Sequence, residues 1–221
     1  MSILEATELY RFYHSGDAEV VALRGVSLFL DKGELVALLG PSGSGKSTLL
    51  HLIAGLDDPD GGHVDVGGQR LSRRSETVRA KIRARHIGIF MQAGNLIDHL
   101  TVGGNIRLQR SLAGKHGTDA AFASFATKLG LSAHWNALPA QLSGGEAARA
   151  GLAVALAAEP AILLCDEPTA EVDSETEREI IADLAERRKA GVAILVATHS
   201  PALAKAADRV IRLRDGRLAN D

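Results

Sequence analysis

The sequence contains little of what disulfide-linked or membrane-embedded proteins need. Its 221 residues include a single cysteine, Cys165, so no disulfide can form within the chain. Aromatic residues account for only 4% of the composition, and no apolar run approaches the ~20 residues of a membrane-spanning helix. The first five residues lack the basic start and the long apolar stretch of a secretory signal. We therefore expect a cytoplasmic protein whose cysteine is a small core residue.

No excess of one charge sign is present either. The formal net charge is −2 at pH 7, with 24% charged and 46% hydrophobic residues. A nearly neutral chain has no overall electrostatic attraction to nucleic acid or to anionic lipid. The length suits one substantial hydrophobic core or at most two small ones, and no internal repeat or low-complexity segment is evident. We expect a single domain over residues 1–221.

The most informative segment is a glycine-rich turn. It lies between the apolar run 35–39 and the helix-like segment 49–54. The order strand, glycine-rich turn, helix is the context in which the pattern G-x-x-x-x-G-K-[ST] marks a phosphate-binding loop. The residues of this phosphate loop are Gly40, Pro41, Ser42, Gly43, Ser44, Gly45, Lys46, Ser47 and Thr48.

Each residue type in the phosphate loop has a chemical role. Glycines let the backbone turn tightly, so that successive N–H groups point at phosphates, and the N-terminus of the next helix adds its positive dipole end. Lys46 can reach the β- and γ-phosphates, and the Ser47 hydroxyl can ligate Mg²⁺. The alternative, a glycine-rich surface turn without function, is disfavoured by both flanking segments. The sequence predicts a site for a nucleoside triphosphate.

Several apolar runs predict β-strands in an α/β fold. Two hairpins are indicated, one within residues 3–30 and the other around Asp215-Gly216. We expect a three-layer P-loop NTPase core, an N-terminal antiparallel β subdomain, and a helical insertion at about residues 93–150. Uniformly apolar runs, which suit central parallel strands covered on both faces, are residues 87–91, 161–165 and 192–198.

Helical patterns lie between these strands. Residues 101–131 predict two helices, and residues 147–158 predict an alanine-rich helix. Ser174 and Glu177 have the spacing of a capping box, which predicts the start of a long helix. Gly191 is placed to end that helix.

Polar residues that suit phosphate chemistry follow two of the apolar strands. Asp166 and Glu167 come directly after residues 161–165, and His199 follows residues 192–198. The carboxyl ends of parallel strands lie at the edge that holds the phosphate loop. Asp166 is therefore placed to hold Mg²⁺, and Glu167 to deprotonate an attacking water. For His199, a structural role and a contact with the γ-phosphate are equally compatible with the spacing.

The first predicted hairpin contains aromatic residues close to its turn. Strand alternation places Phe12 and Tyr13 on opposite faces. We expect Phe12 to pack in the core. For an aromatic residue at the edge of the sheet, the alternative to core packing is stacking on an adenine ring.

Residues 70–85 form a basic segment, in which Glu76 is the one acidic residue. We expect a solvated helical face, because that is the usual role of a charged run. Contact with the phosphates of nucleic acid or lipid is the alternative. It is disfavoured because no aromatic residues are interleaved for base stacking.

One further segment completes a set that points to a family. Residues 142–146, Leu-Ser-Gly-Gly-Glu, come ahead of the strand that ends in Asp166-Glu167-Pro168. Together with the phosphate loop, Gln92, Asp173 and His199, in chain order, they resemble the nucleotide-binding subunit of an ABC transporter. The resemblance extends over essentially the whole chain. Many NTPases have the phosphate loop, whereas the Leu-Ser-Gly-Gly-[Gln/Glu] segment in this context is specific to that family.

The resemblance implies a head-to-tail dimer that holds two ATP molecules between its subunits. Ser143, Gly144 and Gly145 of one subunit would meet the γ-phosphate that Lys46 of the other subunit binds. The further roles that it implies are adenine stacking by Tyr13, a link from Mg²⁺ to the membrane-facing side by Gln92, communication across the dimer by Asp173, and a catalytic switch by His199.

Within the family, residues 40–68 and 83–92 look most similar to the lipoprotein-release and macrolide- or peptide-export branch. The chain departs from the family pattern at three places. Ala147-Ala148 replaces the common Gln-Gln, Gly104 replaces an acidic residue, and residues 170–172 are atypical. No departure removes a predicted catalytic group.

The function implied is hydrolysis of ATP, with Mg²⁺, that drives a separately encoded integral membrane permease on the cytoplasmic face of the membrane. Glu167 would be the base, with Gln92 and His199 assisting, and no nucleic acid partner is expected. One alternative is a soluble ABC-type ATPase that acts on nucleic acid, which only the basic segment favours. Another is a P-loop kinase, which leaves residues 143–146 unexplained.

Overall fold

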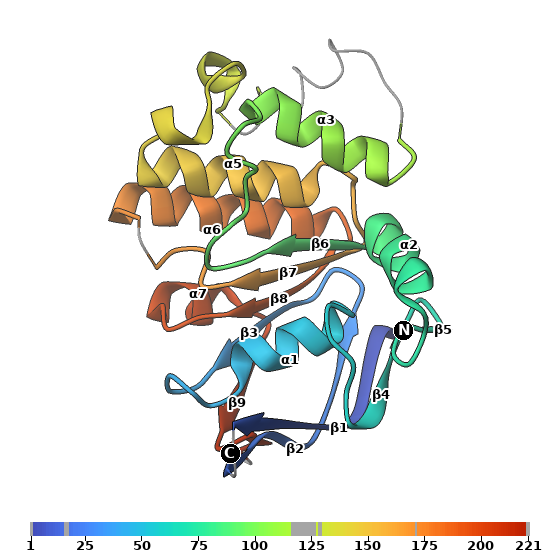
Figure 1. The fold of residues 1–221 in the computed structure, drawn as a ribbon. Helices are drawn as coiled ribbons and strands as arrows, with labels where there is room; N and C mark the ends of the chain where they lie inside the picture. The colour runs from blue at the N-terminus through green and yellow to red at the C-terminus, as the bar shows by residue number, and fades with distance from the viewer. Residues whose placement is uncertain (1, 16–17, 116–126, 128–129, 171, 220–221) are drawn as a thin grey trace.

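The computed structural model arranges the chain as two β-sheets with helices between and around them (Figure 1). It describes residues 2–15, 18–115, 127, 130–170 and 172–219. Within this part of the chain, no helix has both the length and the apolar character that crossing a bilayer requires. The second helix predicted for residues 101–131 falls largely on residues 116–126 and 128–129, which lie outside the described residues.

The predicted N-terminal hairpin is confirmed. β1 (Ser2–Ser15) and β2 (Ala18–Asp31) pair antiparallel along their whole length. β4 (Gly61–Val66) and β5 (Gln69–Arg70) extend this sheet in the order β2-β1-β4-β5. Because alternate residues of a strand point to opposite faces, one face of the sheet is buried and contributes side chains to the main core.

The central sheet places the predicted apolar strands side by side. Its order is β10-β9-β3-β8-β7-β6, and the five strands from β9 to β6 run parallel. β7 and β8 are buried at every residue, as expected for uniformly apolar strands. The strands are β3 (Leu35–Leu39), β6 (Ile87–Phe90), β7 (Ile162–Asp166), β8 (Ala193–Ala197), β9 (Arg209–Arg214) and β10 (Arg217–Leu218).

Helices cover both faces of the central sheet. α1 (Lys46–Ile53) packs between the two sheets, where its leucines share a core with β3, β7 and β8. α5 (Gly144–Leu156), α6 (Ser174–Lys189) and α7 (Pro201–Ala206) pack on the opposite face. Figure 1 shows α5 and α6 on the side of the sheet away from α1. The predicted three-layer α/β core is confirmed.

α3 (Val102–Leu112) packs on the outer side of α5 and forms a third apolar cluster with it. A Cβ atom on Gly103 would lie only 2.5 Å from a ring carbon of Trp135, so the ring lies directly against the backbone of α3. Because α5 belongs both to this cluster and to the core of the sheet, the boundaries 93–150 of a helical insertion stay a prediction.

The capping box predicted at Ser174 and Glu177 is wrong. The residue that caps α6 is Asp173, whose carboxylate accepts hydrogen bonds of 3.0 and 2.8 Å from two N–H groups of the first turn. The hydrogen bond from the N–H of Thr176 is the main cause that lowers the pKa of Asp173 below its ordinary value. Asp and Ser are similarly good capping residues, so composition alone does not separate adjacent candidates.

Phe12 is half-buried and does not join the core as predicted. Its ring stacks on Tyr10, with the ring centroids 6.5 Å apart. The reason lies in the strand pairing. β1 pairs with β4 only as far as Tyr10, opposite Gly61, whereas its pairing with β2 continues to Ser15. Phe12 therefore lies where the hairpin extends beyond its pairing with β4, and its side chain is covered less.

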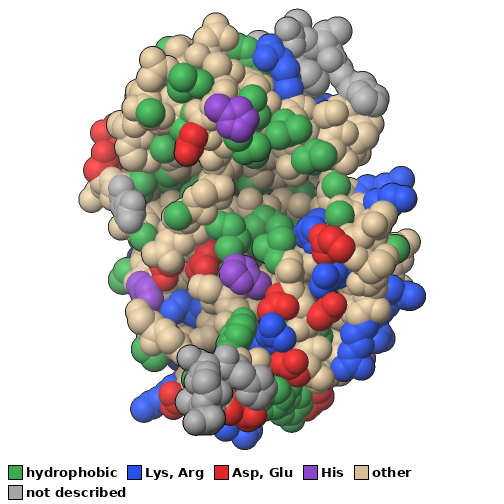
Figure 2. All heavy atoms as spheres, viewed as in Figure 1, with side chains coloured by type: hydrophobic (Ala, Val, Ile, Leu, Met, Phe, Trp, Pro, Cys, Tyr) green, Lys and Arg blue, Asp and Glu red, His purple; other side chains and the backbone are tan. Residues whose placement is uncertain are grey.

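The prediction of a solvated face for the basic segment is wrong in part. Two arginines of α2 (Glu76–His86) are only 14% and 17% exposed, Arg79 and Arg83. Arg79 forms ion pairs of 2.9 Å with Asp58 and Glu76, and Arg83 donates a 2.6 Å hydrogen bond to a carbonyl oxygen after α1. Figure 2 shows Lys and Arg side chains gathered along the edge of the molecule that holds α2 and β5.

Candidate functional site

A cavity of about 930 Å³ opens at the carboxyl edge of the central sheet. The sheet order explains why distant residues meet there. The phosphate loop follows β3, His199 follows β8, Asp166 ends β7, and Gln92 follows β6, and these four strands are consecutive neighbours. The predicted site residues that line the cavity are Tyr13, Ser42, Gly43, Gly45, Lys46, Ser47, Thr48, Gln92, Asp166, Glu167 and His199.

The phosphate loop has the backbone shape of an anion site. Gly45 precedes α1 with a φ of +103°, and no side chain caps the first N–H groups of that helix. A Cβ atom on Gly40 would lie 2.2 Å from the carbonyl oxygen of Leu213, so only glycine fits there. Behind the loop, the Ser44 hydroxyl is buried without a hydrogen-bond partner among the described residues. Gly40, Pro41 and Ser44 shape the loop but do not line the cavity.

The Lys46 ammonium group is held by its own loop. Its Nζ atom donates hydrogen bonds of 2.7 Å to the carbonyl oxygen of Gly40 and 3.2 Å to that of Pro41. It also lies 3.4 Å from Nε2 of His199. The side chain is buried, with 7% of the residue exposed. The Lys46 ammonium group is thus fixed at the N-terminus of α1. Its partners are carbonyl oxygens, which phosphate oxygens can replace.

Glu167 and His199 contact each other across the ends of β7 and β8. Oε2 of Glu167 accepts a 3.2 Å hydrogen bond from the N–H of His199, and Oε1 lies 3.3 Å from its Nε2. Glu167 has a φ of +50°, which is rare for a residue other than glycine and is typical of functional sites. Asp166 beside it is only 3% exposed. Cys165 is a core residue, as predicted, and burial raises the pKa of its thiol.

Tyr13 lies at the other end of the cavity and is 40% exposed. Sequence reasoning missed the residue behind it. The guanidinium carbon of Arg11 lies 4.9 Å from the centre of the Tyr13 ring. Asp57 and Asp60, at 2.7 and 3.3 Å, hold Arg11 there. No sequence signal could have found this arrangement, because both carboxylates come from the loop between α1 and β4.

The remaining predicted residues do not line this cavity. Ser143 caps α5, since its hydroxyl accepts a hydrogen bond from the N–H of Glu146, whose carboxylate in turn accepts one from the N–H of Ser143. This second bond is the main cause that lowers the pKa of Glu146. A Cβ atom on Gly145 would lie 2.9 Å from Oγ1 of Thr176. The starts of α5 and of α6, which Asp173 caps, therefore lie side by side.

A smaller cavity of about 320 Å³ adjoins the first one. Gln92 and Glu167 line both cavities, and Gly144 lines the smaller one. Ala147 and Ala148 form another part of its wall. The small side chains of these two alanines, at which the chain departs from the family pattern, leave this space open.

The comparisons with known proteins settle the family. Residues 23–170 match the sequence model of the ABC transporter family. The chain belongs to this family. It is 40% identical over 224 residues to the uncharacterized ABC transporter ATP-binding protein YbbA of Escherichia coli K12, and the match covers 100% of this chain and 98% of YbbA. It is 37% identical over 222 residues to the macrolide export ATP-binding/permease protein MacB of Syntrophobacter fumaroxidans. That match covers 98% of this chain but only 31% of MacB.

Solved structures agree with this assignment. The dimeric structure of the bacterial ABC transporter cassette MJ0796 superimposes with a TM-score of 0.92 at 32% identity, over 98% of this chain and 97% of that one. The same cassette in a post-hydrolysis state with ADP and Pi has the same TM-score. The predicted P-loop fold, the ABC-type ATPase and the resemblance to the macrolide-export branch are confirmed.

Proposed function

We propose that this cassette hydrolyses ATP to power a separately encoded exporter-type permease from the cytoplasmic face of the membrane. The observation that carries the proposal is that one cavity brings Lys46, Glu167 and His199 together at the start of α1, where no side chain caps the first N–H groups. The names of the macrolide-export relatives support an exporter. Release of phosphate from MgATP by the purified chain tests hydrolysis, and no release at high protein concentration contradicts it.

Ser47, Gln92 and Asp166 fit a magnesium site. All three line the same cavity, next to the predicted position of the triphosphate. They offer a hydroxyl, an amide and one carboxylate oxygen, and Mg²⁺ commonly uses one or two carboxylates together with substrate phosphates and water. When bound, Mg²⁺ would offset negative charge on the phosphate oxygens.

The catalytic tasks follow from the contacts that Lys46, Glu167 and His199 make in this cavity. Lys46 exchanges the carbonyl oxygens of its own loop for the β- and γ-phosphates. Glu167 releases His199 and accepts the proton of the water that attacks the γ-phosphate in line. His199, then free at Nε2, donates a hydrogen bond to a γ-phosphate oxygen.

A second subunit would complete the site. The starts of α5 and α6, with Ser143, Gly144, Gly145 and Asp173, form a neighbouring surface outside the cavity of their own subunit. Residues at a helix N-terminus have N–H groups to offer a phosphate. The dimeric MJ0796 cassette supports a dimer. The head-to-tail arrangement, in which this surface meets the ATP of the partner, is the one that the family resemblance implies.

Replacement of Tyr13 by alanine is expected to weaken ATP binding about 5- to 150-fold, the range that one stacked base contributes. Tyr13→Phe keeps the ring and should bind ATP normally. Inorganic tripolyphosphate, which has no base, should bind both variants and the parent equally. Equilibrium titration measures all three, and unchanged ATP affinity of Tyr13→Ala would leave Tyr13 as a packing residue.

A groove between α2 and α3 is the proposed contact for the permease. Its volume is about 460 Å³, and its wall includes Ala80, Ile89 and Leu112. Leu112 is 64% exposed, the largest value among the large apolar side chains of the described chain. Exposed apolar surface of this kind favours a protein partner. Nucleic acid is disfavoured, because Arg79 and Arg83 beside the groove are already paired with acidic residues or backbone.

Leu112→Glu is expected to remove most of the chain from sedimented native membranes, because a charge would enter the apolar contact. Phosphate release by the isolated chain should stay unchanged. Phe29→Glu, at an exposed apolar residue of β2, is the matched control and should stay membrane-bound. If Leu112→Glu sediments with membranes as much as the parent chain does, the groove is not the contact for the permease. A salt-sensitive shift of DNA, lost when Arg73, Arg74 and Arg85 are reversed in sign, would favour a nucleic acid partner.

A further inference from the structure

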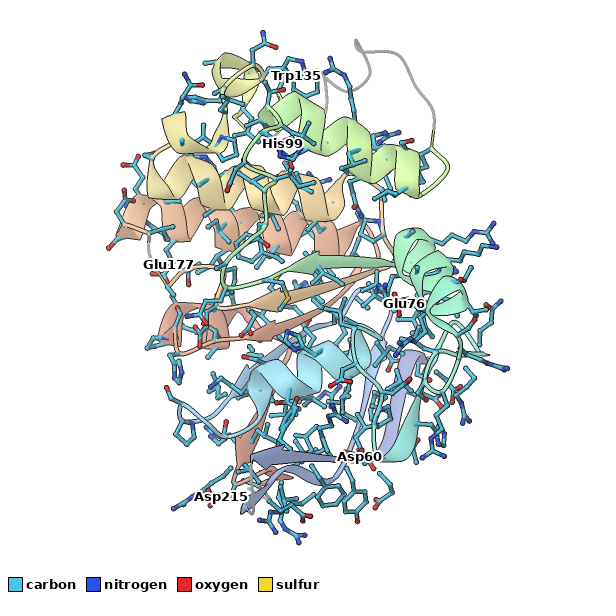
Figure 3. All side chains as sticks on the ribbon, in the orientation of Figure 1. Asp60, Glu76, His99, Trp135, Glu177 and Asp215 are labelled. Atoms are coloured by element: carbon cyan, nitrogen blue, oxygen red, sulfur yellow. The ribbon has the colours of Figure 1, made fainter. Side chains whose placement is uncertain are left out.

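Glu177 and Ser200 form a contact that no sequence pattern predicts. The hydroxyl of Ser200 donates a 2.6 Å hydrogen bond to Oε1 of Glu177, and both residues are half-buried. Glu177 is in the first turn of α6, and Ser200 follows His199 directly and caps α7. Figure 3 labels Glu177 near the beginning of α6, beside α7. The side chains of Glu177, His199 and Ser200 all line the proposed nucleotide cavity.

The other contacts of His199 use groups that the reaction needs. Both carboxylate oxygens of Glu167 are engaged with His199, one with its N–H and one with its Nε2. Nε2 also lies beside Lys46. To act as a base, Glu167 must turn an oxygen to water, and Lys46 must turn to phosphate. These contacts are therefore loosened at the moment when His199 has to be in place.

The contact between Ser200 and Glu177 has no such conflict. Neither residue is needed for phosphate binding or proton transfer in the proposed mechanism. Two other hydrogen bonds of Ser200 are local. Its hydroxyl accepts one of 3.1 Å from the N–H of Leu203, and its N–H donates one of 3.0 Å to the hydroxyl of Thr198. Glu177 instead joins residue 200 to a different helix, whose start is fixed by Asp173.

We propose that Glu177 is a positioning residue of ATP hydrolysis. By holding Ser200, it keeps His199 aimed at the γ-phosphate after Glu167 has turned to the attacking water. The inference rests on the proposed function of this same site. It assigns Glu177 no contact with ATP and no proton transfer, so its effect belongs to the chemical step and not to nucleotide binding.

The test is the rate of phosphate release under saturating MgATP. Glu177→Ala is expected to lower kcat about tenfold, the usual effect of one hydrogen bond, with KM and ATP affinity unchanged. Glu177→Gln keeps an oxygen for the Ser200 hydroxyl and should restore most of the rate. Glu186→Ala is the matched control, because Glu186 is an exposed acid of the same helix that lies far from its start, and it should retain full kcat.

A double variant separates this contact from general destabilisation. Ser200→Ala should lower kcat at least as much, because it also removes the hydroxyl that caps α7. The pair Glu177→Ala with Ser200→Ala should be no slower than Ser200→Ala alone, since both changes remove the same hydrogen bond between the two side chains. A parental kcat in Glu177→Ala, a Glu177→Gln as slow as Glu177→Ala, or a change in KM alone overturns the inference. If the parent chain itself releases no phosphate, the proposed function fails instead, so the two failures are distinct.

Discussion

A Glu167→Gln variant is expected to bind MgATP and to lose hydrolysis by about 100- to 10,000-fold, the usual contribution of a general base. Glutamine has the same shape, and its oxygen can still accept the hydrogen bond that the N–H of His199 donates to Glu167. It cannot accept the proton of the attacking water. The loss of a negative charge near the triphosphate should, if anything, strengthen ATP binding. Phosphate release and equilibrium titration measure the two effects separately.

The same variant should convert the chain from monomer to dimer when ATP is added. With hydrolysis blocked, ATP would stay between Lys46 of one subunit and the starts of α5 and α6 of the other. Size-exclusion chromatography with light scattering measures the change. A variant that binds ATP and stays monomeric at high concentration would indicate that the permease is needed for assembly.

Ser143→Arg in the Glu167→Gln background is expected to reverse the ATP-dependent dimer. The bulk and charge of arginine would occupy the γ-phosphate position across the interface. Because Ser143 also caps α5, its replacement costs about 1 kcal/mol of helix stability. Ser143→Ala loses the cap without the bulk, and is therefore the control that should still dimerise. If the Glu167→Gln single variant hydrolysed ATP at the normal rate, the assignment of Glu167 as the general base would be wrong.

Lys46→Ala is expected to weaken ATP binding by about 100-fold or more, because truncation of a buried charged partner leaves the phosphate charge uncompensated. Turnover should fall with it. Lys205→Ala, at an exposed lysine of α7, is the control and should bind ATP as the parent does. Circular dichroism checks that the variant is folded, since Lys46 also bonds Gly40 and Pro41. Unchanged turnover would contradict the phosphate-loop assignment.

The sequence predicts the parts of this site that depend on local chemistry. The phosphate loop requires a glycine turn between a strand and a helix, and Asp166, Glu167 and His199 directly follow apolar strands. Both patterns can be recognised within about ten residues of chain, and the parallel sheet then brings them to one edge. The three-layer fold follows from the same uniformly apolar strands.

Contacts made across the fold could not be predicted. Arg11 is fixed behind Tyr13 by carboxylates from another loop, and Arg79 is paired with Asp58 from the same loop. Glu177 has the correct spacing for a capping box, yet its carboxylate binds Ser200 of a different helix. In each case a local propensity competes with a tertiary partner, and the partner determines where the side chain lies.

The ring of Trp135, labelled in Figure 3, makes position 103 dependent on position 135. With a Cβ atom only 2.5 Å from that ring, no larger residue fits at Gly103 unless the tryptophan is also replaced. A substitution at position 103 therefore requires a substitution at position 135 as well. A chimera that receives α3 from a relative with a side chain at this position would misfold locally beside the groove proposed for the permease. Transfer of α3 together with residues 132–141 would keep the pair intact.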